Sequence, residues 1–227
     1  DDTFIYEDPK EGWKISRFLP NCSQLDPHDA EQLAKAMSMG RALHESGAKV
    51  ERCFDFYEEG KRYESLLLEK GPIDVPGYWE MAEKAQRLRA LASLDGSCAC
   101  LAHNDFFMLN FLIDNAGQMF LIDWEYAGMS DYAQDFGTFV VCCQLSHEEA
   151  ERALEYYFER TPTFEERCHN FAFVALAGWC WYVWSLVKEA EGECIGEWLY
   201  IYYSYAREYM DKVLSWYAER ETNGVLA

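Results

Sequence analysis

Two short apolar runs joined by a polar turn constrain the fold of this chain more than any other feature of its sequence. Residues 111–113 read Phe-Leu-Ile, residues 119–122 read Met-Phe-Leu-Ile, and the turn at 115–118 reads Asn-Ala-Gly-Gln. Apolar runs of this length on either side of an Asn/Gly turn are typical of a β-hairpin. Strand pairing then predicts that Asn110 and Asp123 lie side by side at the open end of the hairpin.

Side chains that can bind a metal ion or accept a proton gather around this open end. Asp105 precedes the hairpin by a few residues and would meet Asn110 and Asp123 at one point. Phosphoryl transfer uses such a set, because a carboxylate must orient the acceptor hydroxyl while hard oxygen ligands hold Mg²⁺ across the phosphates of a nucleotide. The alternative is a surface hairpin with scattered acidic residues, but the order and spacing of the three side chains favour a catalytic site.

The spacing of two motifs matches a known group of enzymes. His-x-Asp-x-x-x-x-Asn at residues 103–110, followed by Ile-Asp-Trp-Glu-Tyr at residues 122–126, resembles the motifs of the choline/ethanolamine kinase and aminoglycoside phosphotransferase group, relatives of the protein kinases. Bacterial choline kinases are the most similar members, and the resemblance covers about residues 13–215. It implies an α+β, protein-kinase-like fold: a mainly α-helical C-terminal lobe with a catalytic β-hairpin, and a remnant hairpin of the N-terminal lobe. It also implies an ATP-dependent, Mg²⁺-dependent kinase whose substrate is choline.

The resemblance assigns a role to each side chain around the hairpin. Asp105 is the expected catalytic base, which accepts the proton of the alcohol or holds that alcohol in line with the γ-phosphate. His103 belongs to the same catalytic motif, and its expected role is to brace the loop by hydrogen bonding. Asn110 and Asp123 are expected to bind Mg²⁺. Glu125 lies near the metal in this family, either as a direct ligand or one layer further out.

The resemblance also divides the chain into two parts. Residues 1–20 are expected to form the last strands of an incomplete N-terminal nucleotide lobe and the hinge, and residues 21–227 the C-terminal catalytic and substrate-binding lobe. The residues expected near the hinge that binds adenine are Arg17, Phe18 and Leu19. An edge hairpin without a ligand is the alternative. The sequence contains no glycine-rich phosphate loop and no upstream lysine on an interior strand, so we expect little or no kinase turnover from these 227 residues alone.

Aromatic residues late in the chain bear on the substrate. A quaternary ammonium group has no N–H to donate, so a protein holds it with aromatic faces and net negative charge. Trp181 and Trp184 are three residues apart on one helix face, and Trp-x-x-Trp-Ser resembles the choline-binding helix of choline kinases. Tyr203 on the last helix and Tyr126 complete the expected cage, with Asp105 beside it. The alternative is that these rings are ordinary core residues.

One departure from the family affects the choice of amine. Eukaryotic choline kinases carry a glutamate soon after the pattern that reads Asp-Phe-Gly at residues 135–137, whereas this chain has Val-Val-Cys-Cys at residues 140–143. A carboxylate of the choline site is therefore absent or supplied elsewhere, and ethanolamine stays open as a substrate. Aminoglycosides need a wide acidic pocket with few tryptophans, which disfavours them. A catalytically silent choline-binding module is the third possibility. Asp135 itself is expected to brace the catalytic loop.

Helix signals surround these motifs. We expect helices from Asp26 to about Ser46, from about 63 to 70, from 78 to 94, from 132 to 145 and from about 195 to 220. Capping boxes at Ser146 and Thr163 open two more. The apolar run Phe171 to Val187 favours a buried helix over a membrane span.

Charge and cysteine content exclude some classes of partner. A formal charge of −20 disfavours nucleic acid and anionic membranes and favours a cationic small molecule. Nine cysteines, several of them in apolar runs, indicate buried thiols in a reducing compartment and hence a cytoplasmic protein. A zinc site at Cys98, Cys100 and His103 is disfavoured because no second pair of ligands follows. The sequence does not indicate an oligomeric state.

Overall fold

The computed structural model describes residues 4–96 and 99–222, and within them the chain is mainly α-helical. The helices are α1 (Ala30–His44), α2 (Phe56–Lys70), α3 (Tyr78–Ala92), α4 (Ala133–Cys142), α5 (His147–Phe158), α6 (Phe164–Ala190) and α7 (Glu197–Thr222). The strands are β1 (Phe4–Asp8), β2 (Trp13–Ser16), β3 (Ser23–Gln24), β4 (Cys100–Ala102), β5 (Phe111–Ile113), β6 (Met119–Leu121) and β7 (Gly128–Ser130). Short 3₁₀ turns lie at Ser93–Asp95 and Met108–Asn110.

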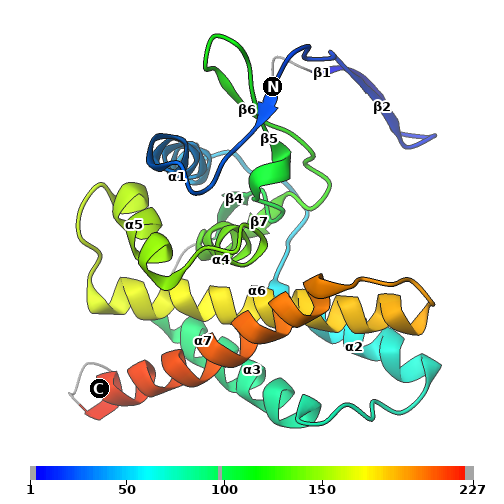
Figure 1. The fold of residues 1–227 in the computed structure, drawn as a ribbon, viewed down its shortest axis with the longest axis vertical. Coiled ribbons are helices and arrows are strands. Elements are labelled where there is room, and N and C mark those ends of the chain that lie inside the picture. Colours follow the sequence, from blue (N-terminus) through cyan, green and yellow to red (C-terminus); the bar gives the residue numbers. More distant parts are fainter. Residues whose placement is uncertain (1–3, 97–98, 223–227) are drawn as a thin grey trace.

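Helix α6 is the central element of the molecule. It runs through the middle of Figure 1, with α7 crossing it and α4, α2 and α3 packed around it. The capping box at Thr163 opens it as predicted, since the Glu166 N–H donates to Thr163 Oγ1 and the Glu166 carboxylate accepts from the Thr163 N–H. The helix is long and apolar enough to cross a membrane, but 89% of its most apolar window is buried inside the protein. Packing of the core therefore accounts for its composition.

Two glycines let α6 approach its neighbours closely. A Cβ atom on Gly137 of α4 would lie 2.3 Å from the backbone oxygen of Phe173 on α6. A Cβ atom on Gly178 of α6 would lie 2.8 Å from the backbone nitrogen of Ala206 on α7. Neither gap admits a methyl group, so glycine is required at both crossings.

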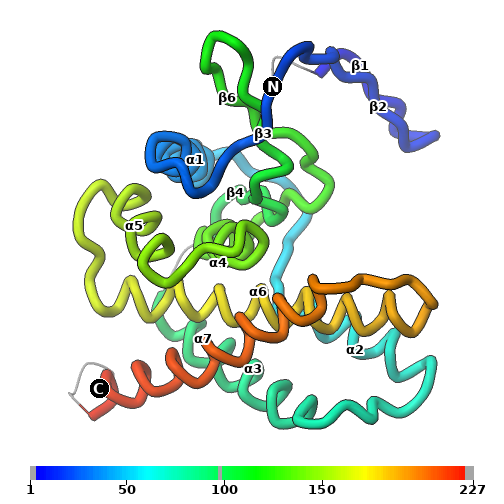
Figure 2. The backbone as a smooth tube through the Cα atoms, viewed as in Figure 1, coloured from blue at the N-terminus to red at the C-terminus, as the bar shows by residue number. Residues whose placement is uncertain are grey.

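The predicted hairpin is confirmed. β5 and β6 pair antiparallel with Phe111 opposite Leu121, and β3 adds a third strand on the other side of β5. The Ile122 N–H donates to the Asn110 carbonyl over 2.9 Å, so Asn110 and Asp123 meet at the open end. Strands β4 and β7 form a separate antiparallel pair. The β1–β2 hairpin projects from the N-terminal end of the molecule, far from the C-terminal end of α7 (Figure 2).

Several element boundaries differ from those expected. Helix α1 is capped by Asp29 instead of Asp26, because Asp29 Oδ1 accepts from two helix N–H groups at 2.9 and 3.0 Å while Asp26 accepts from His28 in the preceding turn. Helix α2 begins at Phe56, seven residues early, because Asp55 caps it. Strands β3 and β7 were not anticipated. Cys98, at the start of an expected strand, lies outside the described residues.

Candidate active site

Asp105 and Asn110 lie at the centre of the site. The Asn110 side-chain nitrogen donates to the Asp105 backbone oxygen over 2.8 Å and to Asp105 Oδ2 over 2.7 Å. These two bonds turn the carbonyl oxygen of the Asn110 amide away from Asp105. Burial raises the pKa of Asp105, and the hydrogen bond from Asn110 opposes that rise. A partly desolvated carboxylate with a raised pKa is a better proton acceptor near neutral pH than an exposed one.

His103 and Asp135 fix the catalytic loop in place through hydrogen bonds. The two oxygens of Asp135 accept the backbone N–H groups of His103 over 2.9 Å and of Asn104 over 2.6 Å. His103 is buried and its Nε2 lies 2.9 Å from the carbonyl oxygen of Ile122; since a carbonyl only accepts, Nε2 carries the proton. His103 therefore ties the loop to the hairpin, and Asp135 ties the loop to α4.

Asp123 and Glu125 follow β6 on the exposed side of the site. Asp123 adopts a left-handed backbone conformation with φ of 64°, which places its side chain at the open end of the hairpin. The negative charges of Asp123 and Glu125 lie close enough to raise the pKa of Asp105 further. Arg52 donates a hydrogen bond to the backbone oxygen of Glu125, which ties the segment after β6 to the loop that precedes α2.

The donor set fits a magnesium ion bound jointly with a nucleotide. Within residues 4–96 and 99–222, no group of three or more His, Cys, Asp or Glu side chains is arranged to hold a metal by itself. The oxygens that could hold one come from Asp123 and Glu125, together with the amide oxygen of Asn110. Mg²⁺ commonly takes one or two carboxylates and completes its shell with water and substrate phosphates. The charges of Asp123 and Glu125 repel that of Asp105, and a divalent cation bound nearby would remove that repulsion.

A cavity of about 320 Å³ adjoins the open end of the hairpin. Arg17, Phe18 and Leu19, the residues predicted near the adenine, line one side of it. Leu112 and Asp123 line the other side. Phe18 is 84% exposed, so the ring is available to a ligand at the rim of this cavity. The structure thus brings the predicted nucleotide residues and one predicted metal ligand to the same space.

Five aromatic rings form a continuous cluster beside the hairpin. Trp181 meets Tyr126 with ring centroids 6.1 Å apart and Trp184 at the same distance, both edge to face. Phe54 and Phe56 complete the cluster at 5.9 Å from Tyr126 and 5.8 Å from Trp181. Trp181 is 7% exposed, whereas Tyr126 and Trp184 are half-buried, so parts of their faces reach solvent. The structure therefore gathers three of the four rings that the sequence analysis assigned to the substrate.

Tyr203 lies apart from this cluster. Its ring packs on Tyr182 with centroids 5.4 Å apart, and it lines a cavity with Lys84 and Arg207 between α3 and α7. Its neighbour Tyr202 lies nearer the site: burial, Cys142 and the charge of Asp105 raise the pKa of its hydroxyl. Adjacent residues of an α-helix are turned by about 100° relative to each other, so a one-residue misplacement moves a ring to another face.

Asn104 is a second residue that sequence reasoning missed. It has a φ of 63°, and its amide nitrogen donates to the carbonyl of Tyr126 over 3.0 Å. Ser130 on β7 donates to the amide oxygen of Asn104 over 2.8 Å. Asparagine tolerates the left-handed conformation better than most residues, which was the available signal at this position. Through these contacts Asn104 joins the catalytic loop to the aromatic cluster.

The fold and the site together define a phosphotransferase of the protein-kinase type, in which a helical lobe presents the loop and hairpin that carry Asp105, Asn110 and Asp123. The model of the phosphotransferase enzyme family matches residues 11–168, more than half of the chain. The chain belongs to this family.

Similar proteins agree with this placement. Protein LicA of Haemophilus influenzae is 27% identical over 208 residues, which cover 84% of this chain and 74% of that protein. The crystal structure of choline kinase LicA from Streptococcus pneumoniae has a TM-score of 0.79 at 24% identity and covers 93% of this chain and 75% of that one. The structure of LicA in complex with AMP has a TM-score of 0.79 at 22% identity, and the match covers 94% of this chain and 74% of that one. The predicted fold class is confirmed, and the chain spans about three quarters of each relative.

Proposed function

We propose that this chain is the C-terminal lobe of an ATP-dependent choline kinase, which transfers the γ-phosphate of ATP to the hydroxyl of choline with the help of Mg²⁺. Residues 1–20 would contribute the last strands and hinge of the nucleotide lobe, and residues 21–227 the catalytic and substrate-binding lobe. The enzyme would act in the cytoplasm, where its cysteines stay reduced. A LicA structure that contains AMP and another that is named a choline kinase support the nucleotide and the substrate.

One observation carries the proposal: Tyr126 belongs to both halves of the site. Its backbone carbonyl accepts a hydrogen bond from Asn104, next to the catalytic Asp105, and its ring lies 6.1 Å from Trp181. An ammonium group held against these rings would place the attached hydroxyl, two carbons away, toward Asp105. Rings bind a methylated ammonium through their negative faces, which matches the chemistry of choline.

The side chains then have distinct tasks. Asp105 would accept a hydrogen bond from the choline hydroxyl and take its proton as the new P–O bond forms, while the bond from the γ-phosphorus to the bridging oxygen breaks and ADP leaves. Asn110, Asp123 and Glu125 would hold Mg²⁺, which when bound neutralises charge on the phosphates. Arg17, Phe18 and Leu19 would contact the adenine. Tyr126, Trp181 and Trp184 would hold the ammonium, and we add Tyr202 in place of Tyr203 because its hydroxyl lies near Asp105.

A substrate panel tests the proposal. ADP release by the intact protein, including the nucleotide lobe, should require choline and be absent with kanamycin. Asp105→Ala should lower kcat by about a hundredfold or more, as expected for loss of a general base. Trp184→Ala should raise the KM for choline, whereas Trp79→Ala, which removes an exposed tryptophan on α3, should not. An unchanged KM in Trp184→Ala would show that the ammonium does not bind there.

Two alternatives remain distinguishable in the same experiment. Ethanolamine retains N–H donors and needs a smaller cage, so a preference for ethanolamine would redefine the substrate without changing the catalytic residues. Tight choline binding without ADP release would indicate a non-catalytic choline-binding module. For the 227 residues alone we expect amine binding with little turnover, because the sequence lacks a glycine-rich phosphate loop.

A further inference from the structure

A glutamate on α2 lies beside the aromatic cluster, although no sequence motif marks it. Glu59 is half-buried, with 19% of its side chain exposed. The adjacent Gly60 lies directly against Trp179, where a Cβ atom would come within 2.3 Å of the ring, so α2 is seated tightly on α6. This contact fixes the position of Glu59 relative to the tryptophans of α6.

Tyr63 connects Glu59 to the proposed substrate site. Its ring is buried, and it lies close enough to both Glu59 and Tyr126 to affect the pKa of each. On the same helix, Phe56 lies about one turn before Glu59, and its ring centroid is 5.8 Å from that of Trp181. The carboxylate is therefore only one tyrosine away from a ring of the proposed cage.

Arg62 contacts the Glu59 carboxylate and an aromatic ring together, as a bound amine would. Its Nε lies 3.0 Å from each oxygen of Glu59, and its guanidinium lies 4.5 Å from the centroid of the Tyr63 ring. A cation that contacts a carboxylate and an aromatic face together is the arrangement expected for an ammonium ligand. The Arg62 side chain is 53% exposed, so it can swing into solvent without breaking the core.

The cage lacks a counter-charge from the segment after Asp135. Val140 and Val141 are fully buried in α4 and carry no charge. The carboxylates of Asp105, Asp123 and Glu125 are assigned to the proton and the metal. We propose that Glu59 supplies the carboxylate that balances the charge of the amine substrate, and that Arg62 pairs with Glu59 until the amine arrives. This inference rests on the proposed function and identifies Glu59 as the residue that makes the substrate site prefer a cation.

Exchange of the Arg62 guanidinium for the amine substrate explains why a Glu59–Arg62 pair would be useful in the empty site. A half-buried carboxylate without a partner is costly, so the Arg62 guanidinium stabilises the empty site. When the amine binds, it takes over the neutralisation of Glu59 and Arg62 moves to water. Removal of Arg62 should therefore strengthen amine binding, and removal of the Glu59 charge should weaken it.

Calorimetric titration with choline chloride tests this exchange. Glu59→Gln should weaken choline binding about fivefold and Arg62→Gln should tighten it about threefold, as expected for a partly exposed charge pair beside an aromatic ring. Dimethylbutanol, the uncharged carbon isostere of choline, should bind both variants as it binds the wild type. Arg160→Gln is the matched control, because Arg160 pairs with Glu166 at a similar exposure, 51% and 25%, and lies 5.1 Å from the Phe158 ring.

The outcomes separate this inference from the proposed function. If the wild type binds choline and Glu59→Gln binds it equally well, Glu59 is not the counter-charge and the inference fails while the function stands. If another amine binds in place of choline and Glu59→Gln weakens it, the inference stands and the choline assignment fails. Equal losses for choline and dimethylbutanol would indicate a packing role and overturn the inference. Failure of the wild type to bind any amine would overturn both.

Discussion

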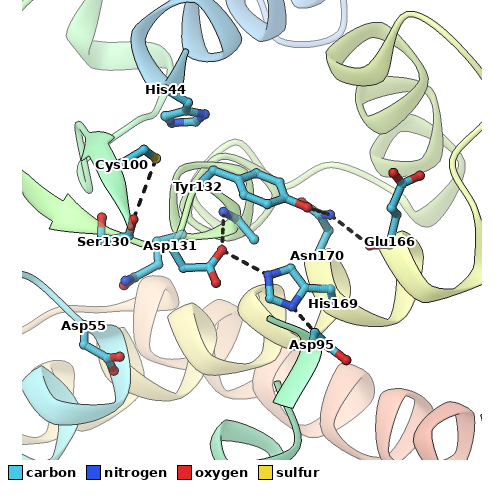
Figure 3. Close-up of polar contacts among 12 residues, drawn as sticks. His44, Asp55, Asp95, Cys100, Ser130, Asp131, Tyr132, Glu166, His169 and Asn170 are labelled. Carbon is cyan, nitrogen blue, oxygen red and sulfur yellow. Dashed lines mark hydrogen bonds and ion pairs between the residues drawn. The ribbon is translucent and has the colours of Figure 1, made fainter. Parts of the chain in front are cut away.

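A buried histidine between two carboxylates predicts that the protein loses stability at mildly alkaline pH. His169 on α6 is 4% exposed, with Nδ1 3.0 Å from Asp95 Oδ2 and Nε2 3.0 Å from Asp131 Oδ1 (Figure 3). Both ring nitrogens face carboxylate oxygens, so both donate and the ring is an imidazolium. Arg220 and Tyr217 on α7 also bind Asp95, which makes this cluster a junction between α6 and α7.

The size of the effect follows from the shift in proton affinity. Burial alone would lower the pKa of His169, but the hydrogen bonds to Asp131 and Asp95 outweigh it and raise the pKa from 6.5 to about 9. At about 1.36 kcal/mol for each tenfold change in proton affinity, this difference stabilises the folded state by about 3 kcal/mol. A raised pKa means that the contribution is complete below pH 6.5, declines above it, and is lost as the pH passes about 9.

Denaturant unfolding across this pH range measures the effect. The free energy of unfolding of the wild type should fall by about 3 kcal/mol more than that of His169→Gln as the pH rises through this window. Comparison with the variant removes the contribution of other groups that titrate in the same range. Parallel pH profiles for the two proteins would refute the reasoning, because they would show that His169 does not take up its proton on folding.

Three further predictions concern the site and its support. Gly137→Ala should lower the free energy of unfolding by about 1–3 kcal/mol or more, since the added methyl group has no space at the α4–α6 crossing; an unchanged denaturation midpoint would contradict this. Asp135→Asn should reduce kcat by about tenfold or more, while far-UV circular dichroism stays helical, because the loop backbone loses its charged acceptor. Tyr202→Ala should raise the KM for the amine, and Tyr203→Ala, the matched control on the same helix, should leave it unchanged.

The features that the sequence predicted are local ones. The hairpin and the openings of α5 and α6 depend on residues within a few positions of one another, such as Ser146 and Glu149 in a capping box. The start of α2 was missed because Phe54, Phe56 and Tyr57 are aromatic residues that favour strands, and the cap at Asp55 outweighs them. Tertiary packing decides where such a helix begins, and a single sequence does not show that packing directly.

The two residues that we add to the proposed site, Tyr202 and Glu59, depend on helix phase and on contacts between distant segments. On α7 aromatic residues occur at positions 200, 202, 203 and 205, so the pattern does not show which face meets the catalytic loop. Glu59 lies on α2 without a motif, and its relation to Tyr126 exists only because α2 packs on α6. For both residues, the way the helices pack against one another must be known before a role in the site can be proposed.

Helix α6 explains how the two halves of the site keep a fixed separation. In its C-terminal third it carries Trp181 and Trp184, and a few turns earlier, at Phe173, it meets Gly137 of α4, where no methyl group fits. Two residues before that glycine, Asp135 binds the backbone of the catalytic loop, so the position of Asp105 depends on the same helix that positions the tryptophans. Displacement of α4 along α6 would therefore move Asp105, the proposed base, relative to the proposed substrate cage, and even about 1 Å of such misplacement costs an enzyme a large part of its rate. For this reason Gly137→Ala should reduce kcat by a larger factor than the fraction of unfolded protein explains, and measuring kcat per folded molecule tests that coupling.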